Sequence, residues 1–161
     1  MNDADFIIGL MKTETDALGF IPSTAIRSRW IAKGRFIIQR DRRGRRRGYL
    51  LHGPANPGRE LYVNQICIEY DHRLKGHALM AIDELIGRGR RGRCTQINLR
   101  CAANLSANWF WLATGFHLVT AELGGQRRNR RILVYRYPLN IPDRQTPTPH
   151  LYRIPGVSKV G

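Results

Sequence analysis

Residues 71–79, written DHRLKGHAL, join a β-branched run to an amphipathic run. A helix that starts directly after a strand presents free backbone N–H groups and the positive end of its dipole, and such an end binds anions. Gly76 lets the backbone approach a ligand closely, and Arg73 and Lys75 add positive charge beside it. The pattern therefore predicts a phosphate or pyrophosphate site at residues 73–78, although a tight structural turn explains the same junction about as well.

A second motif, NLSANWFWLATGF, covers residues 104–116. Together the two motifs resemble the GNAT superfamily of acyl-CoA-dependent N-acyltransferases. In that family a strand leads into Gln/Arg-x-x-Gly-x-Gly/Ala, which holds the coenzyme A pyrophosphate, and the matching residues are Arg73, Gly76 and Ala78. The family later shows Asn-x-x-Ala, an aromatic residue and Gly-Phe, matched by Asn104, Ala107, Trp111, Gly115 and Phe116.

The resemblance implies a GNAT-like fold of the mixed α/β class with a central β-α-β-α unit, and transfer of an acetyl group from acetyl-CoA to an amine. It implies that a strand edge pairs with the pantetheine arm, at Ile66, Cys67 and Ile68. It also implies a backbone cradle for the pyrophosphate, made by Arg73, Leu74, Lys75, Gly76, His77 and Ala78. Beside the pantetheine and thiol it places Asn104, Asn108 and Trp111. Alternatively, Asn104 is a turn residue, Asn108 a solvated helix position and Trp111 a core aromatic.

Acetyl transfer to an amine needs a base that accepts a proton. Glu60 and Tyr62 alternate on one face of the strand before the loop, so they are the predicted catalytic residues, with Glu69 as a second candidate. Alternatively, Glu60 has no catalytic role and forms a salt bridge with an arginine at the strand edge. Many relatives carry a tyrosine where this chain has Trp111, and an indole N–H cannot serve as the acid towards the thiolate. His72 and His77 are expected at an exposed helix start, and no metal site is expected from the spacing of His and Cys.

Hydrophobic periodicity predicts helices at residues 4–12, from Ser23 to Gly34, at 78–86 and at 106–113. Alternating or β-branched runs predict strands at residues 35–39, 47–52, 61–69, 96–101, 117–121 and 132–137. This order gives one domain at residues 1–137. Residues 138–161 contain five prolines and are expected to form an extended tail.

The charge is strongly positive, with a formal net charge of +15 from 23 arginines and 4 lysines. Arginine's planar fork suits phosphate, so the surplus points to nucleic acid or another polyanion and argues against cationic small molecules. Three arginine clusters are expected in loops or turns, one of them at residues 88–93. The other two are predicted to flank the active-site edge and to contact nucleic acid, through Arg42, Arg43, Arg45, Arg46, Arg47, Arg127, Arg128, Arg130 and Arg131.

Three cysteines at spacings unlike those of metal sites are expected to be reduced thiols. No apolar run approaches the roughly 20 residues that span a bilayer, and the first residues lack the order of a signal peptide. A cytoplasmic protein that is not bound to a membrane is expected, and a homodimer is compatible with the sequence. The alternative function is a GNAT-fold nucleic-acid-binding or interaction module that has lost catalysis, because Trp111 replaces the usual tyrosine.

Overall fold

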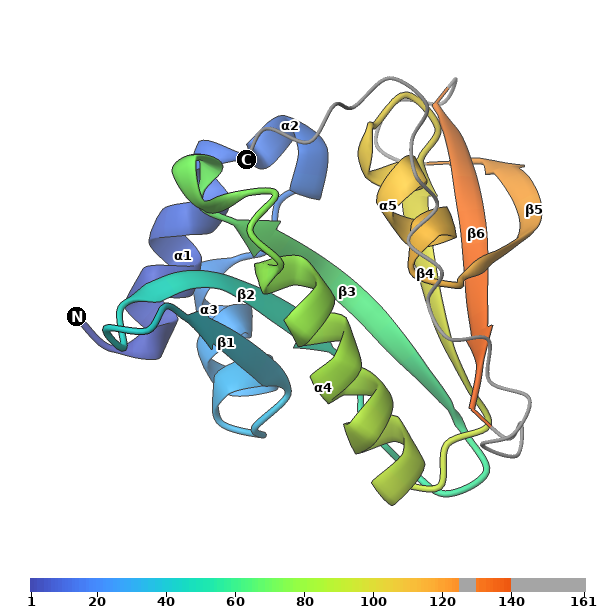
Figure 1. Cartoon of the computed structure of the whole chain (residues 1–161), viewed down its shortest axis with the longest axis horizontal. Coiled ribbons are helices and arrows are strands. Elements are labelled where there is room, and N and C mark those ends of the chain that lie inside the picture. The colour runs from blue at the N-terminus through green and yellow to red at the C-terminus, as the bar shows by residue number, and fades with distance from the viewer. Residues whose placement is uncertain (125–129, 140–161) are drawn as a thin grey trace.

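The computed structural model describes residues 1–124 and 130–139. Helices and strands follow the order α1 (Asp3–Thr13), α2 (Thr15–Leu18), α3 (Ser23–Ala25), the π-helix η1 (Ile26–Ile31), β1 (Phe36–Arg40), β2 (Arg46–His52), β3 (Glu60–Ile68), the 3-10 helix η2 (Tyr70–His72), α4 (His77–Arg91), β4 (Gln96–Ala102), α5 (Ala107–Ala113), β5 (His117–Leu123) and β6 (Arg131–Pro138) (Figure 1).

One mixed sheet of six strands, in the order β1-β2-β3-β4-β6-β5, organises the domain. Neighbouring strands are antiparallel except β3 and β4, which are parallel and joined through α4. The β3–β4 pairing is short, because it joins only residues 60–62 of β3 to residues 96–98 of β4. Beyond this point the two strands diverge, so the sheet opens into a V (Figure 1).

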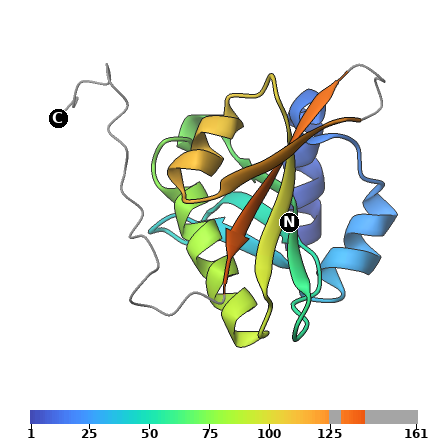
Figure 2. The same ribbon diagram turned by 90° about the vertical axis from the view of Figure 1, so that its right-hand side faces the viewer.

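Two hydrophobic clusters lie on opposite faces of the sheet. The larger one packs α4 and α5 on the sheet, and it includes Leu61, Ile82, Leu99, Trp111 and Tyr135. The smaller one packs α1 and η1 on β1, β2 and the end of β3, and none of its members comes from β4, β5 or β6 in the part of the chain that the structure describes. Figure 2 shows these two groups of helices on the two sides of the sheet.

The fold matches the predicted order of elements, with two differences at the start of the chain. A short helix, α2, was not predicted. The helix predicted to be capped by Ser23 begins at that residue instead, after Pro22, and continues as a π-helix in which Ile26 and Trp30 are buried. As expected, Gly34 follows this helix and has a φ of 63°.

Helix α4 is longer than predicted, because it continues through Gly87 and Gly89 to Arg91. Both glycines disfavour a helix locally. The packing around Gly89 requires a residue without a side chain, because a Cβ there would lie 2.7 Å from a methyl carbon of Leu139. The prediction that residues 88–93 form a loop was therefore wrong for most of that cluster. Leu139 is buried in the core, so the packed domain extends past residue 137.

The rest of the predicted tail, residues 140–161, lies outside the described residues. Among the helices of residues 1–124 and 130–139, none has both the length and the apolar character needed to cross a bilayer.

Candidate active site

The opening between β3 and β4 leaves the later part of β3 without a strand partner on one edge, within residues 1–124 and 130–139. Ile66, Cys67 and Ile68 pair with β2 on one side, while the β3–β4 ladder has already ended at Tyr62. A bulge at Asn64 precedes them, since Leu51 and His52 of β2 pair with residues 65 and 63. Bulges often lie next to active sites. Among the described residues, the predicted strand edge therefore has no partner on the side that faces β4, although the Cys67 side chain itself is buried in the cluster that includes α1.

The loop that follows β3 presents unused donors. Within the described part of the chain, the backbone N–H groups of residues 74–79 donate to no acceptor, and no side chain caps α4. Leu74 has a φ of 59° and a fully exposed side chain, and Gly76 has a φ of 85°. Left-handed conformations at a non-glycine residue cost energy and cluster at ligand clamps. The loop thus has free donors at an uncapped helix start, as the predicted anion site requires, and the site itself stays a prediction.

Arg73 plays a different part from the predicted one. Its backbone N–H donates to the carbonyl of Tyr70, so this amide is already used, whereas the N–H of Leu79 has no acceptor among the described residues. Its guanidinium donates to the carboxylate of Glu14 and, at 3.1 Å, to the carbonyl of Ile68. The Arg73 side chain therefore ties the loop to the end of α1. Lys75 Nζ donates to the carbonyl of Asp71 at 2.7 Å.

His77 is buried, which corrects the expectation of an exposed helix start. Its side chain is 7% exposed, and its ring lies 6.2 Å from that of His72 between centroids. Its Nδ1 atom has no hydrogen-bond partner among the described residues. His77 therefore anchors the first turn of α4 by packing, while its backbone N–H stays available to a ligand.

Asn108 is a structural residue. Its Nδ2 donates to the carbonyls of Ala102 at 2.8 Å and Leu105 at 2.7 Å, and its Oδ1 accepts from the hydroxyl of Tyr135 at 2.9 Å. The side chain is 8% exposed. Asn108 is therefore neither a cofactor contact nor a solvated position, the two predicted alternatives. Its buried hydrogen bonds connect α5 to β4 and β6. Asn104, in contrast, is exposed in the turn after β4 and is open to a ligand.

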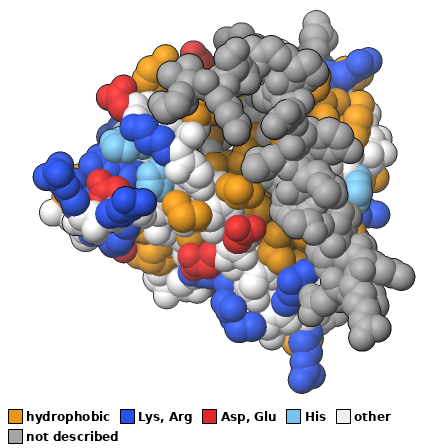
Figure 3. All heavy atoms as spheres, viewed as in Figure 1, with side chains coloured by type: hydrophobic (Ala, Val, Ile, Leu, Met, Phe, Trp, Pro, Cys, Tyr) orange, Lys and Arg blue, Asp and Glu red, His pale blue; other side chains and the backbone are white. Residues whose placement is uncertain are grey.

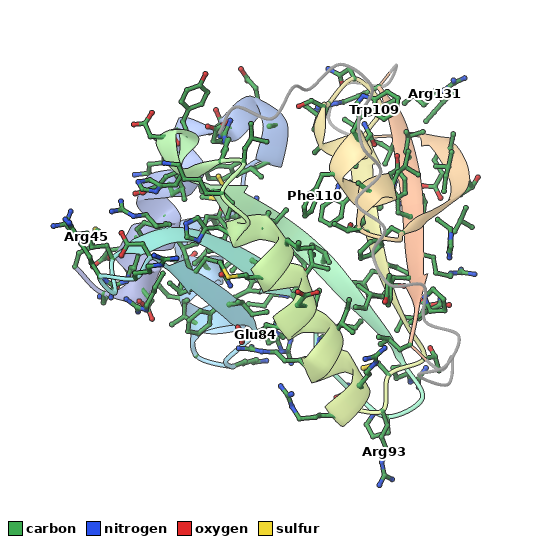
Figure 4. All side chains as sticks on the ribbon, viewed as in Figure 1. Arg45, Glu84, Arg93, Trp109, Phe110 and Arg131 are labelled. Atoms are coloured by element: carbon green, nitrogen blue, oxygen red, sulfur yellow. The ribbon has the colours of Figure 1, made fainter. Side chains whose placement is uncertain are left out.

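Trp111 is a core aromatic residue. It is 4% exposed, and its ring lies 5.4 Å from that of Phe116 and 5.1 Å from that of Phe110 between centroids. In Figure 4 the Phe110 ring extends from α5 towards β3, into the region between the two halves of the sheet. The structure thus gives Trp111 a packing role and no access as a proton donor.

A hydrogen-bonded network crosses the last paired positions of β3 and β4. The Tyr62 hydroxyl donates to the Glu60 carboxylate, and Gln96 Nε2 donates to the same carboxylate at 2.6 Å. The hydrogen bond from Tyr62 holds the pKa of Glu60 below its usual value, helped by Gln96, Asn98 and the charge of Arg136 and opposed by partial burial. The same contact raises the pKa of Tyr62. Glu60 is therefore an ionised, fixed carboxylate at neutral pH, with Tyr62 as its partner, and no arginine of residues 1–124 and 130–139 is directly bound to it.

The network lies in a row of paired residues that crosses four strands, β3, β4, β6 and β5. Tyr62 pairs with Asn98, Asn98 with Arg136, and Arg136 with His117. Arg136 Nε donates to Asn98 Oδ1 at 3.4 Å, and Arg136 and His117 are exposed. Sequence reasoning missed Gln96, Asn98 and Arg136. The signal available in the sequence was the alternation of polar and apolar residues in QINLRC, residues 96–101, which places Gln96 and Asn98 on one face of the strand.

Glu69, the second candidate base, is held elsewhere. Its carboxylate accepts from Arg47 Nη1 at 2.9 Å. It lies after the end of β3, away from the paired positions that hold Glu60. The structure therefore favours Glu60 over Glu69 as the available carboxylate.

The predicted arginine contacts divide into two groups. Arg46 pairs with Asp3 at 2.5 Å and Arg47 with Asp41 at 2.8 Å, so these two side chains are used inside the fold. The exposed arginines of the same turn are Arg42, Arg43 and Arg45. Arg127 and Arg128 lie outside the described residues, while Arg130 and Arg131 stand at the start of β6. Figure 4 shows Arg45 and Arg131 at separate outer ends of the molecule, and Arg93 at a third.

Neither a protein-family model nor a curated protein sequence matches the chain. Solved structures do match. Ard1 from Thermoplasma volcanium has a TM-score of 0.69 at 11% identity, covering 86% of this chain and 94% of that one. A GCN5-related N-acetyltransferase from Kribbella flavida has a TM-score of 0.69 at 18% identity, covering 86% and 95%. An aminoglycoside 6'-N-acetyltransferase in complex with coenzyme A has a TM-score of 0.69 at 10% identity, covering 86% and 91%. As the two sequence motifs predicted, the chain has the fold of the GNAT N-acetyltransferases.

Proposed function

We propose that this chain is an N-acyltransferase that transfers an acetyl group from acetyl-CoA to an amine. The observation that carries the proposal is the coincidence of two features on β3. The strand loses its β4 partner after Tyr62, and the helix that follows it opens with unused N–H groups at residues 74–79. An extended pantetheine arm fits the free strand edge, and a diphosphate fits the uncapped helix start. A structure with the same fold is a complex with coenzyme A, which supports this assignment.

Bound acetyl-CoA would supply an activated acyl group to this site. Glu60, ionised and fixed by Tyr62 and Gln96, is the proposed base that accepts the proton lost by the amine nitrogen. Tyr62 keeps the carboxylate in place and is half exposed, so that it can contact the acceptor. Trp111 gives the thiolate no proton, but thiols have pKa values near 8.5, and a thiolate is a tolerable leaving group at neutral pH.

The acceptor that we propose is an amine carried by nucleic acid or by a protein bound to it. The net charge of +15 and the exposed arginines at the β1–β2 turn support a polyanionic partner. All three cysteines are unpaired in the structure, which supports the cytoplasm as the location. A homodimer stays a prediction.

The test is an acetyl-CoA assay that follows release of free thiol, with single-stranded or duplex DNA, RNA or a basic peptide as the acceptor. The proposal expects release that depends on the acceptor and is lost in Glu60→Gln. Glu69→Gln is the matched control, because it removes the same charge from a carboxylate that is bound to Arg47. Binding of coenzyme A without thiol release for any acceptor would favour the non-catalytic module. Absence of coenzyme binding would refute both.

A further inference from the structure

Asp41 fixes the turn between β1 and β2 from within. Its Oδ1 accepts from the backbone N–H of Arg43 at 2.9 Å and of Arg45 at 3.0 Å. Its own N–H donates to the carbonyl of Arg45, and the N–H of Gly44 donates to the carbonyl of Asp41, both at 2.9 Å. One aspartate thus sets the backbone of the whole turn, an arrangement typical of Asp in turns.

The turn is also tied to the end of β3, which leads into the loop before α4. Arg47 donates to Asp41 Oδ2 at 2.8 Å and to Glu69 Oε2 at 2.9 Å, and the N–H of Glu69 donates to the carbonyl of Arg47 at 2.8 Å. Although partial burial opposes ionisation, the hydrogen bonds from Arg47 and from the turn amides lower the pKa of Asp41 to about 2. The acidic groups near the turn are therefore engaged in holding it.

Three arginines of the turn remain outside these contacts. Arg42, Arg43 and Arg45 are exposed, and none of their side chains has a partner in the part of the chain that the structure describes. Figure 3 shows Lys and Arg side chains gathered at the end of the molecule where this turn lies, and Figure 4 shows Arg45 pointing outward. We call these three residues the arginine tip.

We propose that the arginine tip binds the phosphate backbone of duplex nucleic acid. Arginine presents a planar fork of donors that matches phosphate, and here three forks project from a turn whose shape is already set. A two-stranded ribbon fits the groove of a duplex. The tip carries no aromatic side chain for stacking on bases, and we assign its three arginines to phosphates, so we expect binding that is independent of sequence. This inference rests on the proposed function in one respect only: both take nucleic acid as the partner.

The test measures binding alone, so that it can fail or succeed independently of acyl transfer. The anisotropy of a labelled DNA duplex of about 20 base pairs is followed from about 50 to 200 mM salt. The tip variant is Arg42→Ser/Arg43→Ser/Arg45→Ser. The control is Arg59→Ser/Arg91→Ser/Arg93→Ser, three exposed arginines at the other end of β3 and α4. Both change the net charge equally, from +15 to 15 − 3 = +12.

Losing three phosphate contacts should flatten the slope of log K against log salt by about 2.7 in the tip variant, and by less than about 1 in the control. Thermal unfolding of each variant checks that it is folded. Equal losses in the two variants would overturn the proposal, as would absence of duplex binding by the unmodified protein at the lowest salt. Stronger binding to a single strand of the same length would overturn the assignment to duplex.

A second pair of variants tests the preset shape of the turn. Asp41→Asn and Asp41→Ala both raise the net charge to 15 + 1 = +16. Only asparagine retains an oxygen that can accept from the turn amides. We expect Asp41→Asn to bind the duplex several-fold more tightly than Asp41→Ala, although the two have equal charge. Equal affinities would show that the shape of the turn does not matter.

Discussion

The sharpest prediction for the fold concerns Asn108, which sequence reasoning placed beside the cofactor and the structure places in the core. Asn108→Ala removes the buried hydrogen bonds with Tyr135, Ala102 and Leu105. At about 1 kcal/mol for each bond, the free energy of unfolding should fall by about 3 kcal/mol. Tyr135→Phe removes one of these bonds and leaves Asn108 Oδ1 without its donor, so it should cost about 1–2 kcal/mol.

Urea denaturation of the two single variants and the double variant measures these costs and their coupling. Because the two side chains share one bond, the double variant should lose less than the sum of the single losses, by about 1 kcal/mol. Coenzyme A affinity of the folded Asn108→Ala variant should stay close to that of the unmodified protein. An Asn108→Ala variant with full stability and no affinity for coenzyme A would refute the structural role.

The remaining predictions concern the proposed base and helix α4. Glu60→Gln should lower the rate of acyl transfer by about 10²–10⁴-fold in a steady-state assay, and equal rates would remove Glu60 from the mechanism. Because the hydrogen bond from Tyr62 lowers the pKa of Glu60, Tyr62→Phe should raise that pKa and move the acidic limb of the pH–rate profile upward. An unmoved limb would contradict that coupling. Gly87→Ala should stabilise the protein by about 0.5–1 kcal/mol, since its Cβ meets only a flexible side chain. Gly89→Ala should be less stable than Gly87→Ala by about 1–3 kcal/mol in urea denaturation, because its Cβ meets Leu139, and equal stabilities would contradict the packing.

The strands and the turn that opens α4 could be predicted because their signals are local. Residues 61–68 read as a strand from their β-branched residues, and Gly76 marks the turn that opens the next helix. The parity of the strand also placed Glu60 and Tyr62 on one face, which the hydrogen bond between them confirms. Such signals depend only on neighbouring residues in the sequence, so they can be recognised without knowledge of the fold.

Other features depend on contacts between distant segments. The need for glycine at position 89 of α4 comes from Leu139, about fifty residues further along the chain. The part that Asn98 and Arg136 play beside Glu60 depends on the register of β3, β4 and β6, which no single strand encodes. The burial of His77 likewise follows from tertiary packing, and nothing in the local pattern indicates it.

The central claim is that the uncapped start of α4 holds the diphosphate of coenzyme A. Gly76 and Gly58 both have positive φ angles, of 85° and 68°, and a Cβ at either would meet no atom within 4 Å. Valine at either position therefore introduces comparable backbone strain, but only position 76 adjoins the proposed ligand. Calorimetric titration with coenzyme A should show binding to the unmodified protein and to Gly58→Val, and a loss of at least about tenfold in affinity, or about 1.4 kcal/mol, in Gly76→Val. Equal affinity in the two variants, or no heat with the unmodified protein, would contradict the claim.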